Sequence, residues 1–355
     1  MTGGGTGGHV YPALALAREL VRRGHAPATV RFVGARRGLE ARVVPEAGFG
    51  IDLLPGRGLQ RRVTLANARA LWENLVALTR ARRIVERAHP AVVVGVGGYA
   101  SLPCLLAARW RRVPAVVHEQ NAAPGLANRV SVRLGARAAT SLPGTPLRGA
   151  VLTGNPIRPE IAAIRRRPAD PPLLAVFGGS LGARRLNDAA IGLYGRWRSR
   201  DDVAVHHVSG TRDYDDCVAA LAAGKHPGDA LEYSLVHYED HMETLYARAA
   251  LVVCRAGAVT VAELAAAAVP SVLVPLPGAP GDHQTHNART LVDAGAAVLV
   301  PDAECDAARL DAVAGELLAD PARLGAMAAA AGGLARPEAA ARLADLVEEV
   351  ARAGR

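Results

Sequence analysis

The stretch Met1-Thr2-Gly3-Gly4-Gly5-Thr6-Gly7-Gly8-His9 leads directly into a helical pattern that starts at Val10. Glycine tolerates positive φ and has no side chain, so such a run lets backbone N–H groups approach a ligand closely, and the positive end of the following helix attracts anions. The run also matches G-x-G-x-x-G, a dinucleotide-binding spacing that is weak evidence when it stands alone. That spacing normally follows a β-strand, whereas only Met1 and Thr2 precede it here. The run therefore predicts a phosphate-binding turn at the start of a doubly wound domain.

The second half of the chain repeats this arrangement with its strand present. Leu173–Phe177 is a continuous apolar run typical of a buried parallel strand, residues 178–183 form a second glycine turn, and a helical pattern begins near Arg184. Half of the residues are apolar and only 4% are aromatic, which suits helices packed on parallel strands. Two such units, separated by a Pro- and Arg-rich stretch over 154–172, predict an α/β protein with two similar doubly wound domains.

The net charge of +9 is concentrated in one region of the first half. Between residues 56 and 115 the sequence holds eleven Arg and two Glu, so this segment alone carries as much net charge as the whole chain. Such a face favours an anionic partner. A membrane surface rich in anionic lipid fits better than nucleic acid, because the segment has few aromatic side chains for stacking and no recognised nucleic-acid motif. A solvated basic face without a partner is the alternative.

Cysteine usage and hydropathy favour a soluble protein from a reducing compartment. The four cysteines are scattered, without C-x-x-C pairs or metal-finger spacing. The N-terminus lacks a basic segment followed by an apolar one, so no signal peptide is predicted. The longest uncharged stretch, 264–281, is interrupted by four prolines and is not expected to form one spanning helix.

Polar residues follow several predicted strands. His118-Glu119-Gln120-Asn121 comes at the end of a short strand that begins at Ala115, and ligands of open α/β sheets bind at such ends. Loop capping is the competing explanation for these four residues. In the second half, the glycine turn at 178–183, a predicted helix start at 258–263, and a loop with Gln284 and Asn287 together outline an anion-binding site. Glu263 is placed in the first turn of its helix, where it either stabilises the helix end or accepts hydrogen bonds from ribose.

Seven motifs in one order resemble the MurG family of bacterial peptidoglycan glycosyltransferases, and the resemblance covers almost the whole chain. The motifs are the run from Gly3 to Pro12, Gly95-Val96-Gly97-Gly98-Tyr99, His118-Glu119-Gln120-Asn121, Gly154-Asn155-Pro156-Ile157-Arg158, Gly178-Gly179-Ser180-Leu181-Gly182-Ala183, Cys254-Arg255-Ala256-Gly257-Ala258-Val259-Thr260, and Asp282-His283-Gln284. The resemblance implies a GT-B fold, with two Rossmann-like domains facing a cleft. The domains are expected at 1–157 and 158–336, with a final helix at 337–355 packing back on the first.

The resemblance also implies transfer of N-acetylglucosamine from UDP-N-acetylglucosamine to the muramoyl-pentapeptide carried on undecaprenyl pyrophosphate, with inversion at C1 and no cofactor. The first domain would receive the acceptor and the second would bind the donor. The expected donor-binding residues are Arg158, Ser180, Glu239, Ala258, Val259, Thr260, Val261, Ala262, Glu263 and Gln284, with Thr6, Gly7, Gly8 and Asn121 reaching the ligand from across the cleft. Two positions depart from the family pattern: Glu239 replaces a usual apolar residue, and Leu181 replaces a polar residue seen in many members.

Inverting transfer needs a general base for the acceptor hydroxyl and stabilisation of the departing UDP. His9 is the preferred base because imidazole exchanges protons near neutral pH, and Glu119 is the alternative. A ligand-orienting or helix-start role is the competing explanation for His9. Helix N-termini, Ser180 and Arg158 would stabilise UDP without a metal. Asp213-Tyr214-Asp215 has D-x-D form but lies in a polar, surface-like segment, so metal binding there is not expected.

The resemblance also implies a partner for the basic segment, which is the anionic inner surface of the cell membrane. The protein is expected to be peripheral on the cytoplasmic face of that membrane. Leu71, Trp72, Leu75 and Trp110, ringed by Arg69, Arg80, Arg109, Arg111 and Arg112, are the expected contact residues. A buried core stripe is the competing explanation for Leu71 and Leu75.

Other functions remain open at this point. They are another GT-B enzyme, such as a transferase for a different lipid or a UDP-sugar epimerase; an NADP-dependent oxidoreductase that uses Arg36 and Arg37; and a non-catalytic membrane-binding protein. The first strand of the N-terminal domain is missing from the sequence, because only Met1 and Thr2 precede the glycine run. We therefore expect several apolar residues to precede Met1 in the natural protein.

Overall fold

The computed structural model describes residues 1–36, 38–55 and 65–354, with the side chains of 65–74 left out. The chain divides into two compact units. Unit 1 consists of Met1–Arg158 and Pro337–Arg355, and unit 2 of Pro159–Arg336. Both units are α/β, and the described strands pair in parallel throughout. The prediction of two doubly wound domains is confirmed.

The sheet of unit 1 falls into a pair, β1-β2, and a group of four, β3-β4-β5-β6. The strands are β1 (Phe32–Ala35), β2 (Ile51–Leu54), β3 (Val93–Gly95), β4 (Ala115–Glu119), β5 (Arg137–Thr140) and β6 (Val151–Leu152). Strand β5 was not predicted, because Arg137-Ala-Ala-Thr140 has small side chains and no β-branched run.

Residues 1–3 link these two groups of strands. Thr2 forms parallel bridges to Val33 in β1 and to Gly95 in β3. The Thr2 N–H donates to Val94 O at 2.7 Å, and the Val33 N–H donates to Met1 O at 2.8 Å. The central position between β1 and β3, where no strand was predicted, is thus occupied by residues 1–3, and the glycine run continues from them.

Helices cover both faces of the unit 1 sheet. They are α1 (Gly7–Arg22), α2 (Glu40–Glu46), α3 (Leu65–Ala88), α4 (Ser101–Trp110), α5 (Leu126–Arg133) and α14 (Ala339–Ala353), with a short 3-10 turn at Pro27–Thr29. One core joins α1, α2 and α14 to the strands, and a second lies under α3 and α4. Helix α1 starts at Gly7 rather than at the predicted Val10, so the last two glycines of the run belong to its first turn.

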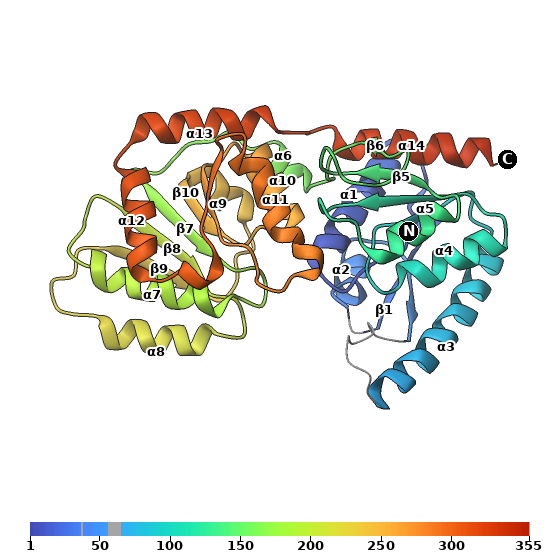
Figure 1. The fold of residues 1–355 in the computed structure, drawn as a ribbon, viewed down its shortest axis with the longest axis horizontal. Coiled ribbons are helices and arrows are strands. Elements are labelled where there is room, and N and C mark those ends of the chain that lie inside the picture. Colours follow the sequence, from blue (N-terminus) through green and yellow to red (C-terminus); the bar gives the residue numbers. More distant parts are fainter. Residues whose placement is uncertain (37, 56–64, 355) are drawn as a thin grey trace. The chain divides into compact units, whose positions relative to one another are not determined.

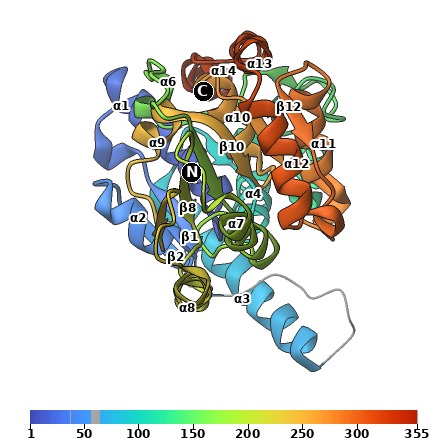
Figure 2. The same ribbon diagram turned by 90° about the vertical axis from the view of Figure 1, so that its left-hand side faces the viewer.

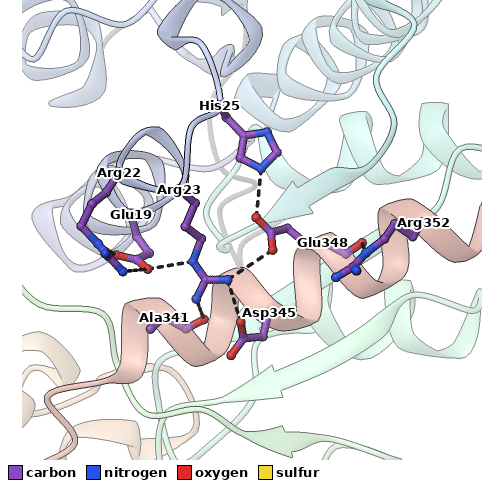
Figure 3. Close-up of polar contacts among 8 residues, drawn as sticks. All are labelled: Glu19, Arg22, Arg23, His25, Ala341, Asp345, Glu348 and Arg352. Atoms are coloured by element: carbon purple, nitrogen blue, oxygen red, sulfur yellow. Dashed lines mark hydrogen bonds and ion pairs between the residues drawn. The ribbon is translucent and has the colours of Figure 1, made fainter.

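The chain returns to unit 1 through α14, which packs beside α1 (Figure 1). Leu343 and Val347 are buried in the shared core. Figure 3 shows the polar contacts at the edge of this packing: the Arg23 guanidinium donates to Asp345 Oδ1 at 2.6 Å and to Ala341 O at 2.8 Å, and His25 Nε2 lies 2.9 Å from a Glu348 oxygen. An apolar face and a row of charge-assisted hydrogen bonds thus hold the C-terminal helix on the first unit.

Unit 2 has one six-stranded sheet in the order β12-β11-β10-β7-β8-β9. The strands are β7 (Leu173–Phe177), β8 (Ala204–Val208), β9 (Glu232–Val236), β10 (Ala249–Cys254), β11 (Ser271–Leu273) and β12 (Ala297–Leu299). β7 and β10 are buried at every position, as their continuous apolar runs predict. The order reverses beside β7, so the loops after β7 and β10 flank the switch point where ligands of such sheets bind.

The helices of unit 2 are α6 (Pro159–Ala162), α7 (Arg184–Trp197), α8 (Tyr214–Gly224), α9 (Met242–Arg248), α10 (Ala258–Ala266), α11 (His283–Val292), α12 (Ala307–Leu318) and α13 (Pro321–Gly333), with 3-10 turns at Pro280–Asp282 and Asp302–Glu304. Helix α7 packs against α8 and α12, as Figure 1 and Figure 2 show. Helix α8 was not predicted. Two predictions were wrong: the helix expected at 261–268 begins three residues earlier as α10, and the loop expected at 281–287 is largely the first part of α11.

Candidate functional site

The glycine run of unit 1 turns tightly against a second glycine pair. A Cβ added to Gly98 would lie 2.2 Å from Gly4 O, so only glycine fits at that position. The buried carboxylate of Glu40 holds the turn from the other side, because Oε2 accepts from the Gly5 N–H at 2.8 Å and Oε1 accepts from the Ala35 N–H at 2.7 Å. Glu40 was not predicted as a site residue, because an acidic residue at a helix start is ordinary.

The predicted residues Thr6, Gly7, Gly8 and His9 lie together at the start of α1. Thr6 is the N-cap, and its carbonyl accepts from the His9 N–H at 3.1 Å. The N–H groups of Gly7 and Gly8 have no acceptor within the helix, as at any helix N-terminus. These groups are therefore oriented to donate to an anion.

The His9 imidazole packs over the backbone of Gly97. A Cβ added to Gly97 would lie 2.9 Å from His9 Nε2, and Gly97 has a φ of +89°. On the other side of the ring, Thr6 Oγ1 lies 3.4 Å from Nδ1. The missing side chain at Gly97 therefore makes room for His9. The paired glycines after β3 were the available signal for this position.

Glu119, the alternative base, is buried and fully engaged by neighbouring donors. Oε1 accepts from the Asn121 backbone N–H at 3.0 Å and from Asn121 Nδ2 at 3.3 Å. Oε2 accepts from the Gly125 N–H at 2.9 Å and from Asn128 Nδ2 at 2.8 Å. These bonds give the carboxylate a structural task, which is to shape the turn that carries Asn121.

His118 connects this turn to the segment that ends at Arg158. Its Nε2 lies 3.0 Å from Gly154 O, which can only accept, so Nε2 carries the hydrogen and Nδ1 accepts from Gln120 Nε2 at 3.0 Å. Burial lowers the pKa of His118 to about 4, which keeps the ring neutral. His118 thus ties β4 to the Gly154 loop at the carboxyl edge of the sheet.

Arg158 ends that loop and belongs to unit 1. Its guanidinium lies over the ring of Tyr11 on α1, with the central carbon 5.5 Å from the ring centroid. The two side chains help to line a cavity of about 220 Å³ beside α1. This predicted donor-binding residue is therefore close to the first turns of α1.

The glycine turn of unit 2 packs against the end of β8. A Cβ added to Gly182 would lie 2.0 Å from Ser209 O, and the Thr211 N–H donates to Ser180 O at 3.3 Å. The side chains of Ser180 and Leu181 are exposed at the tip of the turn. Helix α7 begins just after it, at Arg184, so the turn opens onto a helix N-terminus as the sequence predicted.

A buried chain of hydrogen bonds supports this turn from below. Asn187 Nδ2 donates to Ser209 O at 3.0 Å, and Asn187 Oδ1 lies 3.0 Å from His207 Nε2. The Tyr233 hydroxyl lies 2.9 Å from His207 Nδ1, so this nitrogen accepts while Nε2 donates. The chain crosses β9, β8 and α7, and no local sequence pattern marks its members as partners.

The first aspartate of the D-x-D sequence does not lie on the surface. Asp213 is buried, and it accepts from Arg212 Nη2 at 2.8 Å and from Arg184 Nη2 at 3.0 Å. The hydrogen bond from Arg212 is the main reason that the pKa of Asp213 lies below its ordinary value. Its carboxylate is committed to arginine, and Asp215 lies in the first turn of α8.

Loops after β7, β10 and β11 leave the sheet side by side, because Phe177 pairs with Cys254 and Cys254 with Leu273. The loop after β10 leads into α10, whose N-cap is Gly257, so the predicted Ala258, Val259 and Thr260 occupy the first turn and Val261, Ala262 and Glu263 follow. Glu263 was wrongly placed in the first turn. It lies in the second, where it is buried and one oxygen accepts from the Tyr246 hydroxyl at 3.1 Å.

Gln284 lies in the first turn of α11, and its Oε1 accepts from the Leu276 N–H at 2.9 Å. Asn287, one turn later, donates to Ala256 O at 3.2 Å. Both residues were predicted on a loop. Their helical position gives them a second task, which is to bind the loops that follow β10 and β11.

Glu239 lies in the loop after β9. One carboxylate oxygen is 3.1 Å from His206 Nε2, and the other accepts from the His241 N–H at 2.8 Å. Its side chain also lines a cavity of about 400 Å³. The departure from the family pattern is thus accommodated by two local partners.

The proposed membrane-facing residues are described only in part. The side chains of Arg69, Leu71 and Trp72 lie outside the described residues. Leu75 is 52% exposed and Trp110 is 57% exposed, which excludes the core explanation for Leu75. Arg80, Arg109, Arg111 and Arg112 are also exposed. None of the helices described is both long enough and apolar enough to cross a membrane.

The two buried histidines predict acid sensitivity in both units. Burial lowers the pKa of His118 and of His207 to about 4, whereas an unfolded chain binds these protons near pH 6.5. Between those values the unfolded state holds more protons, so the free energy of unfolding falls as the pH is lowered. We expect a loss of about 2 kcal/mol per histidine between roughly pH 7.5 and pH 5. Hydrogen exchange at a series of pH values would measure it in each unit separately.

Two single substitutions test whether these histidines cause the acid sensitivity of each unit. His118→Gln should flatten the pH dependence of unit 1 alone, and His207→Gln that of unit 2 alone. The slope is compared rather than the absolute stability, because each variant also loses hydrogen bonds. Wild-type slopes in both variants would contradict the assignment.

Comparisons with known proteins agree with this arrangement. Residues 1–140 match the glycosyltransferase family 28 N-terminal domain, and residues 173–349 match the family 28 C-terminal domain. Two similar curated proteins come from Desulforudis audaxviator (40% identical, covering 100% of this chain and 98% of the relative) and Alkalilimnicola ehrlichii (44% identical, covering 98% of each). Both are named UDP-N-acetylglucosamine–N-acetylmuramyl-(pentapeptide) pyrophosphoryl-undecaprenol N-acetylglucosamine transferase.

Among solved structures, Acinetobacter baumannii MurG is similar, with a TM-score of 0.78, 30% identity and 98% of each chain covered. A UDP-N-acetylglucosamine 2-epimerase shares the fold at 16% identity, with a TM-score of 0.66 over 98% of this chain and 95% of the epimerase. The oxidoreductase alternative has no support in these matches. The family models cover both units and the relatives match end to end, so the chain belongs to glycosyltransferase family 28 and, within it, to the MurG family.

Proposed function

We propose that this chain transfers N-acetylglucosamine from UDP-N-acetylglucosamine to N-acetylmuramyl-(pentapeptide) pyrophosphoryl-undecaprenol. The observation that carries the proposal is identity of 37–44% over at least 98% of the chain with proteins named for this reaction. The glycine turns of both units and the imidazole beside the first of them supply the chemistry that the reaction needs.

Unit 2 binds the donor in this proposal. The N–H groups and the Ser180 hydroxyl at the glycine turn hold the diphosphate, and the first turn of α10 adds a second positive helix end. Glu263 accepts hydrogen bonds from the ribose hydroxyls, and the backbone at Glu239 reads the uracil. Gln284 contacts the sugar, and Arg158 supplies positive charge.

Unit 1 receives the acceptor and supplies the base. The acceptor hydroxyl attacks C1 of the sugar, the bond from C1 to the phosphate oxygen breaks, and UDP leaves with the negative charge. The hydroxyl proton passes to His9 Nε2. Glu119 is the weaker candidate, because four donors already occupy its carboxylate in the turn that carries Asn121.

The direct test is transfer of radiolabelled sugar from UDP-N-acetylglucosamine to a soluble analogue of the lipid-linked acceptor. We expect a labelled disaccharide product and release of UDP. An epimerase would instead convert the donor without an acceptor, and no conversion under either condition would refute the proposal.

We further propose that unit 1 binds the anionic inner surface of the cell membrane and that the protein is peripheral on the cytoplasmic face. Exposed Leu75 and Trp110 and the arginines around them are the contacts. We expect co-sedimentation with liposomes that contain anionic lipid, weaker binding in high salt, and a loss for Trp110→Ser. Leu181→Ser, at an exposed position of unit 2, is the control. Binding that is indifferent to lipid charge and to salt would contradict the proposal.

A further inference from the structure

The space above Gly97 is shared by two side chains. A Cβ added to Gly97 would lie 2.9 Å from His9 Nε2 and 3.8 Å from Gln120 Oε1. Because Gly97 has no side chain, the imidazole and the amide carbonyl approach the same small volume from α1 and from the end of β4. Gln120 therefore lies beside the proposed base. The sequence predicted it within the polar cluster 118–121, but an individual role was expected only for its neighbours Glu119 and Asn121.

The orientation of the Gln120 amide follows from its partners. Gly154 O fixes the hydrogen of His118 on Nε2, so His118 Nδ1 can only accept, and the Gln120 atom 3.0 Å from it must be the NH2 group. The same NH2 group donates to His118 O at 3.2 Å. With its nitrogen committed to His118, the amide directs its oxygen toward Gly97.

That oxygen lacks a hydrogen-bond donor in the part of the chain that the structure describes. Gln120 is only 1% exposed. The oxygen is not among the fully buried side-chain atoms that lack a partner, so it keeps some accessible surface and can accept a hydrogen bond from a donor outside the protein. We propose that Gln120 Oε1 accepts a hydrogen bond from the acceptor sugar, next to the hydroxyl that His9 deprotonates.

The acceptor chemistry limits the donors that Gln120 can meet. An N-acetylmuramyl unit linked through C1 to pyrophosphate and etherified at C3 keeps two hydroxyls and one acetamido N–H. One hydroxyl is the nucleophile, so the partner of Gln120 is either the other hydroxyl or the N–H. Gln120 then aligns the sugar for attack and selects for that donor. This inference rests on the proposed function.

The test combines Gln120→Met, which keeps the side-chain length but removes the amide, with two acceptor analogues. One lacks the non-reacting hydroxyl, and the other has an ester oxygen in place of the acetamido nitrogen. With the natural acceptor sugar we expect Gln120→Met to lower kcat/KM for the acceptor by about 10–100-fold, with the KM for UDP-N-acetylglucosamine unchanged. With the analogue that lacks the partner group, wild type and variant should be nearly equal.

The analogue with which wild type and variant become equal identifies the sugar group that Gln120 contacts. The dependence of the wild-type-to-variant ratio on the acceptor separates a contact with the sugar from a purely structural role. If Gln120 served only to hold His118, the variant would lose the same factor with every acceptor, and that result would overturn the inference. Equal activity of wild type and variant with the natural sugar would also overturn it. An inactive wild type would instead refute the proposed function.

Discussion

His9→Ala is expected to lower kcat for sugar transfer by about 10²–10⁴-fold and to leave the Kd for UDP-N-acetylglucosamine almost unchanged. The imidazole takes the proton from the acceptor hydroxyl in the proposed mechanism, whereas the donor is held by the loops of unit 2. Single-turnover transfer measures the chemical step, and calorimetric titration with the donor measures binding. His9→Gln keeps a polar group over Gly97 without a base, so it should be as slow as His9→Ala.

Glu119→Gln is the matched control for this assignment. Its carboxylate accepts from the Asn121 and Gly125 N–H groups and from Asn128, so the variant should lower the stability of unit 1 and turn over slowly because its turn is disturbed. Its pH dependence of kcat should keep the shape of the wild-type curve. An active His9→Ala together with a stable but inactive Glu119→Gln would give the base role to Glu119.

The sequence predicted the elements whose signals are local. Leu173–Phe177 is a continuous apolar run, and its bounds agree with β7 because a buried parallel strand needs apolar residues on both faces. β5 was missed because two alanines carry no strand signal, although both are buried in the two cores of unit 1. Two helices start three residues earlier than predicted, in both cases at or beside glycine: Gly7 and Gly8 lie inside α1, and α10 begins directly after Gly257.

The candidate site could be predicted only where local sequence motifs mark its residues. The two glycine turns that lead into α1 and α7 were predicted because spacing and residue type mark them, and the role of Ser180 in the second turn stays a prediction. Glu40 was not predicted, because its task depends on a hydrogen bond from Gly5, which is distant in the sequence. Gln120 was predicted within the polar cluster 118–121, but its approach to the space above Gly97 was not. Asn187 likewise meets His207 and Ser209 only after β8 has paired with β7. Such pairings depend on the assembled sheet, so one sequence does not reveal them.

Gly182→Ala is expected to weaken binding of UDP-N-acetylglucosamine by about 100-fold or more and to destabilise unit 2 by several kcal/mol. Gly182 has a φ of +82°, and an added Cβ would lie 2.0 Å from Ser209 O, which is backbone and is itself held by Asn187. The chain cannot relieve the contact by rotating a side chain. The turn must move away from β8, which displaces the N–H groups proposed to hold the diphosphate.

Gly179→Ala in the same turn separates the steric effect from backbone strain. Gly179 has a φ of +95°, but an added Cβ there would meet nothing within 4 Å. The free energy of unfolding of this variant should fall by only about 1–2 kcal/mol, because alanine is strained in the left-handed conformation, and most of the donor affinity should remain. Calorimetric titration with UDP and with UDP-N-acetylglucosamine, together with urea denaturation, compares the two variants. Since they share residue type, turn and sign of φ, equal losses of affinity would show that the packing of the turn on Ser209 does not control donor binding.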